Sequence, residues 1–300
     1  MTPPLPNGRR GRWLGLGAGL ALVVAAACNE VPSDPNTPYS IEFNRAPSPS
    51  VVLGDTMFDS LGYTAPLKAR VFNSQGDEIV GAKVAYRVVA YANVDSGNPA
   101  FIDSVPLTVD SATGLVIGKS AAVYAGKKAR VYAQAGKLQS ATLTVTATRH
   151  PDLIVAASAP TDSFTISFLN PDSLLVVPAT PFAVRVRHTA GAATAADSIV
   201  SDYLVRFSIV QPTGAATDTS YVMLTNGDRK RSELDTTDAS GVASRQLRVR
   251  RLSFPFSKAA GADGLVRDTI VVEASAYREG HQLVSGSPIT FRLIIRANKP

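Results

Sequence analysis

The sequence predicts an all-β protein in which two β-sandwich domains follow an N-terminal apolar segment. First, apolar and polar residues alternate with period two in many short segments, as expected for strands with one buried and one solvated face. Second, clusters of Gly, Pro, Asn and Asp separate these segments, which is typical of turns between strands. Third, no sustained helical period follows residue 28, and the rest of the 300-residue chain is long enough for two domains.

The N-terminal segment has the pattern of a secretory signal peptide over residues 1–27. Three arginines (Arg9, Arg10 and Arg12) precede an apolar run from Trp13 to Ala27. As a helix rising about 1.5 Å per residue, this run is too short to cross a hydrocarbon core of roughly 30 Å. We therefore expect a cleaved signal rather than a permanent membrane span.

Cys28 is the only cysteine in the chain, and it directly follows three alanines, the small residues that a cleavage site requires. The segment resembles the export signal and lipobox of a bacterial lipoprotein, although Ala25 stands where leucine is usual. The resemblance implies that Cys28 becomes the first mature residue and carries a diacylglycerol thioether and an acyl chain such as palmitate. Asn29 follows where an aspartate often retains such proteins at the inner membrane, so the outer membrane is expected. The alternative is ordinary cleavage after Ala27, with Cys28 left as a free thiol.

Residues 28–49 are rich in Pro, Ser and Asn, and we expect them to form a disordered, extended tether. The folded part is predicted to consist of a first domain over residues 50–148 and a second, elaborated domain over residues 149–300. The boundary lies near Pro151, which disfavours helix in the residue before it. Because this connection is short, we expect a semi-rigid pair of domains.

In the first domain, four predicted strands alternate between two sets of side chains, one of them mainly apolar and the other mainly polar. These strands are Leu67–Val71, Lys83–Val88, Lys128–Gln134 and Thr142–Thr146. Gly76, Gly81 and Gly114 stand between them, where turns require backbone conformations that glycine adopts readily. The pattern predicts an antiparallel sandwich with these glycines at its corners.

The second domain repeats this alternation in five predicted strands, but with longer connections between them. The strands are Phe182–Arg187, Tyr203–Ile209, Gln246–Arg250, Thr269–Ala276 and Ile289–Arg296. A hairpin turn is predicted at Arg278–His281. Long loops are predicted at Pro212–Thr219, Asn226–Ser240 and Ser253–Asp268.

The order of turns and strands in the first domain resembles the bacterial immunoglobulin-like domains of invasin- and intimin-type surface proteins. The residues that carry the resemblance are Gly54–Thr56, Leu67–Val71, Gly76–Tyr86, Asp110–Gly114 and Ala125–Ala133. In the second domain, Asp235–Ala243 matches the same turn-and-strand signature, but residues 190–201 replace the glycine-bracketed turn before the central strand. The resemblance implies two tandem immunoglobulin-like β-sandwich domains, and it specifies a fold rather than one function, because this fold hosts many roles.

Candidate catalytic and metal-ligating residues are sparse. His150, His188 and His281 are far apart in the sequence, and no metal-ligand or nucleophile–base spacing connects them. We therefore predict no catalytic residue, no metal site, no cofactor and no enzymatic activity. Aspartates cluster in loops, as Asp235 and Asp238 do, where turn formation is expected and calcium between the domains is the alternative.

The formal net charge of +6 falls to about +3 when the signal arginines are removed, which is too low to predict nucleic-acid binding. Several arginines nevertheless occupy solvent-facing strand positions of the second domain: Arg185, Arg187, Arg206, Arg248, Arg250, Arg292 and Arg296. The candidate binding surface consists of Arg229, Lys230, Arg231, Arg248 and Arg250. Such a surface suits phosphate or carboxylate groups of envelope glycans, or another surface protein. Alternatively, outward arginines simply keep the strands soluble and discourage edge pairing.

Together these patterns predict a non-enzymatic, lipid-anchored cell-envelope protein, a stalk or binding module for surface adhesion or envelope interactions. The loops Asn226–Ser240 and Ser253–Asp268 are the segments expected to bind, because loops carry recognition on such scaffolds. A periplasm-facing accessory subunit of an outer-membrane assembly or transport complex is the second hypothesis. A polysaccharide-acting hydrolase is a remote third, which would need paired carboxylates in a cleft.

Overall fold

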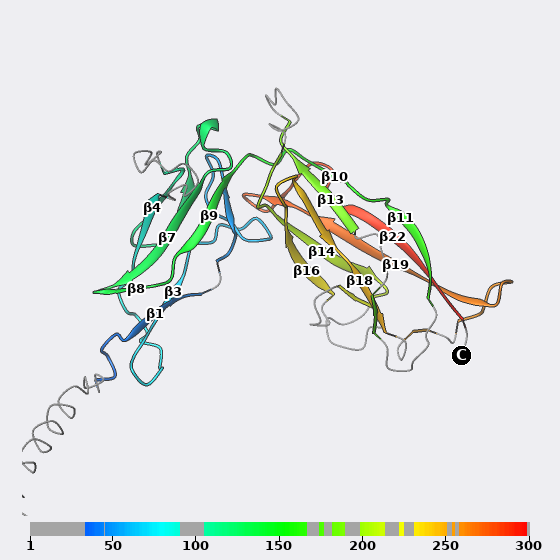
Figure 1. The fold of residues 1–300 in the computed structure, drawn as a ribbon, viewed down its shortest axis with the longest axis horizontal. Helices are drawn as coiled ribbons and strands as arrows, with labels where there is room; N and C mark the ends of the chain where they lie inside the picture. Colours follow the sequence, from blue (N-terminus) through cyan, green and yellow to red (C-terminus); the bar gives the residue numbers. More distant parts are fainter. Residues whose placement is uncertain are drawn as a thin grey trace, which may run out of the picture.

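Two β-sandwiches lie side by side in the computed structural model, joined by a short connection near residue 150 (Figure 1). The structure describes residues 34–44, 46–90, 105–166, 174–176, 182–189, 199–213, 222–224, 231–250, 254–255 and 258–298. These residues contain no α-helix, and the described part of the chain therefore holds no helix that could span a membrane. The all-β fold class predicted from the alternation is confirmed.

The first sandwich packs one larger sheet against two strand pairs. The sheet has the order β2 (Ser50–Val52), β9 (Leu143–Thr148), β7 (Lys128–Ala135) and β4 (Ala85–Ala90), with β8 (Leu138–Gln139) also paired to β7. The pairs are β1 (Ser40–Phe43) with β3 (Ala69–Phe72), and β5 (Leu107–Val109) with β6 (Val116–Gly118). A 3-10 turn, η2 (Ala122–Tyr124), precedes β7. Side chains from both layers, including Ile41, Val71, Leu107 and Val131, form one buried cluster.

The second sandwich has a five-stranded sheet with the order β11 (Thr161–Ile166), β22 (Ile289–Asn298), β19 (Leu265–Ser275), β14 (Leu204–Gln211) and β16 (Ser232–Thr236). The facing layer contains β10 (Leu153–Ala156), β13 (Phe182–Arg187) and β17 (Val242–Arg245), followed by β12 (Leu174–Val176), β18 (Leu247–Arg250) and β15 (Val222–Leu224). A small hairpin, β20 (Tyr277–Arg278) and β21 (Gln282–Leu283), connects β19 to β22.

Both sandwiches share one topological feature that is typical of immunoglobulin-like domains. The first strand, β1 or β10, pairs antiparallel in one layer, and the strand after it crosses to the other layer. There β2 pairs parallel with β9, and β11 pairs parallel with β22, the last strand of its domain. The remaining ladders are antiparallel, which explains why one face of each strand is apolar and the other polar.

The period-two alternation places the core as predicted. In β7, Ala129, Val131 and Ala133 are fully buried while the residues between them are exposed or half-buried. In β22, Phe291, Leu293 and Ile295 are buried in the same way. Burial of a valine, leucine, isoleucine or phenylalanine side chain is worth about 1.5–3 kcal/mol, so these inward rows hold the layers together.

Three predicted segments differ from the structure. Strand β1, Ser40–Phe43, lies within the residues 28–49 expected to be a tether, because its prolines flank the strand rather than interrupt it and Ile41 reaches the core. Strand β16, Ser232–Thr236, lies inside the predicted loop Asn226–Ser240, and β19 begins at Leu265, inside the loop Ser253–Asp268. Polar edge strands such as β16 pair through their backbone, so their side chains lack the apolar alternation.

The predicted turns at Gly114 and at Arg278–His281 are present. Gly114 has φ +74°, and a Cβ there would lie 2.5 Å from the carbonyl oxygen of Leu67, so the turn requires glycine. Gly280 and His281 both adopt positive φ in the hairpin turn.

Candidate functional site

Side chains from distant parts of the chain make several polar contacts where the two sandwiches meet. Strand β9 ends at Thr148 and β10 begins at Leu153, so only four residues connect them. Two buried hydroxyls bridge the sandwiches beside this connection. Ser50 Oγ donates to Asp202 O at 2.7 Å, and Thr148 Oγ1 donates to Ser201 O at 2.9 Å.

Apolar contact joins the same two regions. Val52 and Phe58 belong to the first sandwich in sequence, yet both pack into the buried cluster of the second. The ring of Phe58 meets the ring of Tyr203 edge to face, with centroids 6.1 Å apart and planes at 69°. This is a favoured aromatic geometry.

A loop of the first sandwich, residues 59–63, docks onto the β20–β21 hairpin of the second through His281. The backbone N–H of His281 donates to Gly62 O at 3.1 Å, and its Nδ1 donates to Leu61 O at 2.6 Å. Its imidazole ring lies between two tyrosine rings, stacked on Tyr63 at 4.7 Å and on Tyr277 at 5.1 Å. The contact therefore combines two directional hydrogen bonds with a three-ring stack.

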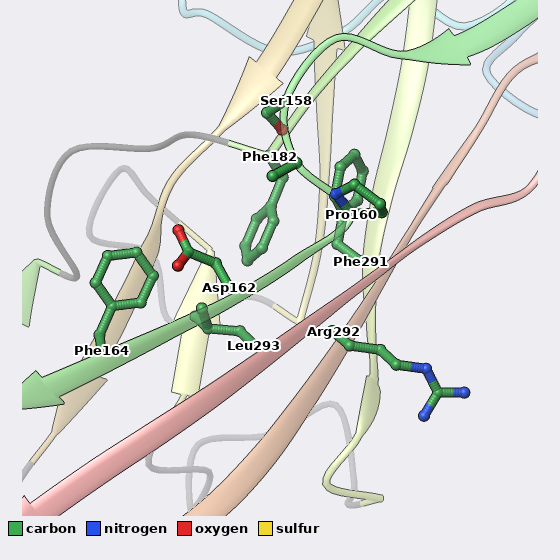
Figure 2. Close-up of a pocket in the computed structure, with 9 residues that line it drawn as sticks. Ser158, Pro160, Asp162, Phe164, Phe182, Phe291, Arg292 and Leu293 are labelled. Atoms are coloured by element: carbon green, nitrogen blue, oxygen red, sulfur yellow. The ribbon is translucent and has the colours of Figure 1, made fainter.

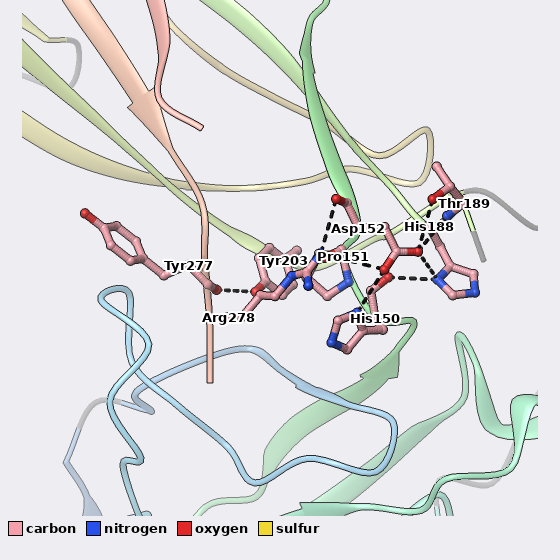
Figure 3. A network of polar contacts seen from close by, with 8 residues as sticks. All are labelled: His150, Pro151, Asp152, His188, Thr189, Tyr203, Tyr277 and Arg278. Atoms are coloured by element: carbon pink, nitrogen blue, oxygen red, sulfur yellow. Dashed lines mark hydrogen bonds and ion pairs between the residues drawn. The ribbon is translucent and has the colours of Figure 1, made fainter. Parts of the chain in front are cut away.

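Asp152 is the centre of a polar network on the connection itself (Figure 3). His150 Nδ1 lies 3.0 Å from its Oδ1, and His188 Nδ1 lies 2.9 Å from its Oδ2. His188 Nδ1 is also 2.9 Å from His150 O, and Thr189 N donates to Asp152 Oδ2 at 2.8 Å. Because oxygen atoms of a carboxylate or carbonyl only accept, both Nδ1 atoms carry hydrogen here.

Arg278, on the β20–β21 hairpin, forms hydrogen bonds with the segment that connects the two sandwiches. Its Nε donates to Pro151 O at 2.8 Å, and its Nη2 donates to Asp152 O at 3.2 Å. Next to it, the hydroxyl of Tyr203 donates to Tyr277 O, and burial raises the pKa of Tyr203 far above its ordinary value. Tyr203 is therefore a neutral structural donor.

Carboxylates from the two sandwiches face one another across this contact. Burial, and then the charge of Glu279, raises the pKa of Asp55 above its ordinary value, while His150 and Arg278 lower it. Glu279 Oε1 accepts a hydrogen bond from Thr56 Oγ1, next to Asp55 in the chain. The interface thus buries part of a like-charged pair.

The chemistry of this junction is that of an interface. The imidazoles of His150 and His188 both direct Nδ1–H to oxygen atoms of the protein. Within the described residues, no group of three or more His, Cys, Asp or Glu is arranged to hold a metal ion. The aspartate Asp238, in one of the predicted acidic loops, accepts hydrogen bonds from the backbone N–H groups of Ser240 and Val242, as a turn-forming residue does.

The structure places the predicted basic residues as follows. Cys28, Arg229 and Lys230 lie outside the described residues, and only the backbone of Arg250 is described. Arg231 Nη2 donates to the carbonyl oxygens of Ile209 and Pro212, and burial lowers its pKa. Arg248 is half-buried.

The other predicted outward arginines divide between opposite layers of the second sandwich. Arg185 and Arg187 lie on β13, whereas Arg206 lies on β14, and Arg292 and Arg296 on β22. Arg206 is also drawn to the junction, because its Nη2 donates to Ser60 Oγ at 2.5 Å. The arginines therefore do not form one continuous stripe.

A hollow in the second sandwich is lined by residues of β11, β13 and β22 (Figure 2). Phe164, Phe182 and Phe291 line its apolar side, and Asp162 carries a carboxylate at its edge. Phe182 and Phe291 are core residues with centroids 5.4 Å apart, so the hollow is the open margin of the core.

No family model matches the chain, and no curated protein matches it in sequence. Among solved structures, the adhesin InvE of Yersinia pseudotuberculosis is 12% identical with a TM-score of 0.28, covering 85% of this chain and 58% of that one. Domains 5–6 of the S-layer protein SbsC are 11% identical with a TM-score of 0.25, covering 88% and 99%. Extracellular cadherin domains 1–5 of protocadherin gamma B2 are 15% identical with a TM-score of 0.22, covering 88% and 39%.

The chain therefore spans less than two thirds of the InvE and protocadherin structures. All three TM-scores are below 0.5, so the immunoglobulin-like fold is assigned from the strand pairing of the chain itself.

Proposed function

We propose that the chain is a non-enzymatic, lipid-anchored protein of the cell envelope, in which two coupled sandwiches form a short stalk that presents binding loops away from the membrane. The observation that carries the proposal is the junction, where hydroxyl bridges, Phe58, His281 and the Asp152 network tie the two bodies together. A stalk needs such coupling, because freely jointed domains do not hold the distal domain at a fixed distance and orientation from the membrane.

The direction of the chain supports this arrangement. The described N-terminal residues enter the first sandwich at the end away from the junction, and β22 ends at the far end of the second (Figure 1). A protein anchored through Cys28 would then expose the far end of the second sandwich. There residues 258–264 form a turn closed by the Arg267–Asp263 ion pair, part of the predicted binding loop Ser253–Asp268.

Mass spectrometry of the mature N-terminus tests the anchor. We expect cleavage before Cys28 and the added mass of a diacylglycerol thioether with an N-acyl chain, and loss of both from the Cys28→Ala variant. A mature chain that begins elsewhere, or carries an unmodified Cys28, would contradict the lipoprotein assignment.

Protease treatment of intact cells tests surface display. We expect cleavage in intact cells, with cleavage of the same chain in lysed cells as the control. Protection in intact cells together with cleavage in lysed cells would contradict surface display and favour the periplasm-facing accessory subunit.

A further inference from the structure

The outer face of the five-stranded sheet in the second sandwich carries three arginines on two neighbouring strands. On β22, alternate residues such as Phe291 and Leu293 are buried in the core. Arg292 and Arg296 therefore lie on the opposite side of the strand, and Figure 2 shows the side chain of Arg292 pointing away from those of Phe291 and Leu293. Arg267 on β19 is the cross-strand partner of Arg296 and shares its face. These three arginines define the arginine face.

The opposition of Arg267 and Arg296 is unfavourable for the fold by itself, because like charges directly opposite one another on neighbouring strands repel. Asp263 forms an ion pair with Arg267. Among the described residues, no carboxylate forms an ion pair with Arg296, and Glu273, further along β19, forms none with Arg292. The arginine face thus holds two guanidinium groups whose charge the described part of the protein does not neutralise.

One donor of Arg296 is also left without an acceptor. Its Nε atom is buried and makes no hydrogen bond within the described structure, so it lacks the compensation that a bond gives for leaving water. Nε atoms of the same kind occur in Arg185, Arg206, Arg245 and Arg248. In the described ladders, none of those four residues faces a second arginine. At Arg296, a bound anion would both neutralise the repulsion and supply acceptors for the guanidinium group.

Hydroxyl side chains stand beside the arginines on both neighbouring strands. Thr161 on β11 is the cross-strand partner of Arg292. Thr165 on the same strand is the partner of Arg296. Both threonines are exposed, as is Thr269 on the same face of β19. Hydroxyls donate and accept hydrogen bonds, so they can contact neutral oxygen atoms of a ligand as well as charged ones.

The spacing and composition of the arginine face indicate the class of ligand. Arg292 and Arg296 are four residues apart, or about 13 Å along the strand, so a polymer with repeated negative charges reaches both whereas one small anion does not. The described residues of β11, β19 and β22 expose no large apolar side chain that could enter a lipid bilayer. Their outward residues include no aromatic ring on which bases could stack. Carboxylates separated by hydroxyl-bearing units match the alternation on this face, and that is the chemistry of an acidic polysaccharide.

We propose that the arginine face binds an acidic polysaccharide, with carboxylates on Arg292 and Arg296 and sugar hydroxyls on the neighbouring threonines. A guanidinium group holds a carboxylate through two parallel hydrogen bonds, so each contact is both charged and directional. Arg267 attracts the same carboxylate as Arg296, because the two arginines are opposite one another in the sheet. This surface belongs to the second sandwich alone, so the inference depends neither on the lipid anchor nor on the binding loops proposed above.

Binding of polygalacturonate oligosaccharides to the purified full-length chain tests this proposal, with dextran oligosaccharides of equal length as the uncharged control. We expect saturable binding of polygalacturonate and none of dextran. The affinity should fall when the ionic strength is raised to about 1 M, where charges are screened beyond about 3 Å. Polyglutamate, vesicles of anionic lipid and single-stranded DNA represent the other classes of polyanion. Equal or tighter binding of any of them would overturn the assignment to a polysaccharide.

Single variants locate the site. Arg292→Gln and Arg296→Gln should each weaken polygalacturonate binding at least about tenfold, because hydrogen bonds between charged groups are among the strongest in proteins. Arg87→Gln is the matched control, since Arg87 is exposed on β4 of the first sandwich and lies outside the arginine face. We expect this control to bind polygalacturonate like the wild type.

Thermal unfolding separates a binding role of these arginines from a structural one. Replacement of Arg296 removes its repulsion with Arg267, so Arg296→Gln should unfold at the same temperature as the wild type or at a higher one. Arg292 is exposed, so Arg292→Gln remains a valid test even if Arg296→Gln fails to fold. Absence of saturable polygalacturonate binding, unchanged affinity in both variants, or an equal loss of affinity in Arg87→Gln would overturn the proposal.

Discussion

Replacement of Gly62 by alanine should weaken the docking of the two sandwiches while leaving each one folded. Gly62 has φ +83°, and a Cβ there would lie 2.1 Å from Arg278 O and 3.0 Å from the backbone of His281. Neither neighbour is a flexible side-chain end, so the docking loop has to move away. The movement breaks the two hydrogen bonds of His281 and its stacking on Tyr63.

The magnitude follows from those contacts. A hydrogen bond contributes about 1 kcal/mol net and an aromatic stack about 0.5–1.5 kcal/mol. The loss is therefore about 3 kcal/mol of docking free energy, or roughly a hundredfold in the docking equilibrium. The left-handed backbone of an alanine adds about 1–2 kcal/mol of strain within the loop.

Gly76→Ala is the matched control, because Gly76 also has positive φ (+88°) but no atom lies within 4 Å of its Cβ position. Small-angle X-ray scattering measures the outcome: Gly62→Ala should give a larger and more variable maximum dimension, whereas Gly76→Ala should match wild type. Thermal unfolding of the first sandwich should be shifted equally in both. Scattering by Gly62→Ala that is indistinguishable from Gly76→Ala would refute the account of the junction.

Three further changes test the sandwiches themselves. Thr237→Val removes a buried hydroxyl that donates to Val200 O at 2.7 Å and accepts from Tyr203 N at 2.9 Å, so chemical denaturation should show a loss of about 1–3 kcal/mol. Phe207→Ala empties a fully buried position, and the same measurement should show a loss of about 3–5 kcal/mol, against less than 1 kcal/mol for an exposed control such as Val80→Ala. Asp238→Ala should destabilise the chain near neutral pH but less at pH 3. Hydrogen bonds hold the pKa of Asp238 below its ordinary value, and the stability that they supply is lost as pH falls through the lowered value. A difference in stability that does not depend on pH would contradict this account.

Strands with one buried face were predictable from the sequence. β13 was predicted as Phe182–Arg187 and has those bounds, and β7 and β22 differ only at their ends. Their residues alternate because one face meets the core. Strands β1, β2, β10 and β11 are short, contain no sustained alternation and lie beside prolines, so their pairing is set by the crossing between layers rather than by local pattern.

The junction was not predictable as a site. His281 contacts Leu61, which is 220 residues away in the sequence, and His150 and His188 meet only because β13 ends beside the connection between the sandwiches. In the sequence, His150 stands beside Pro151, His188 directly follows the predicted strand Phe182–Arg187, and His281 lies in the predicted turn Arg278–His281. The short segment around Pro151 was the one local signal, and it indicated restricted domain movement without naming the residues that cause it.

The parallel pairing of an early strand with the last strand of each sandwich has a mechanical consequence. A pull on the N-terminal side of β2 or β11 and on the C-terminal end of its partner slides the two strands along each other, so all ladder bonds between them are loaded together rather than one at a time. The β11–β22 ladder joins six residue pairs, and the β2–β9 ladder joins three. Under tension along the chain, the first sandwich would therefore unfold before the second, which would stay folded.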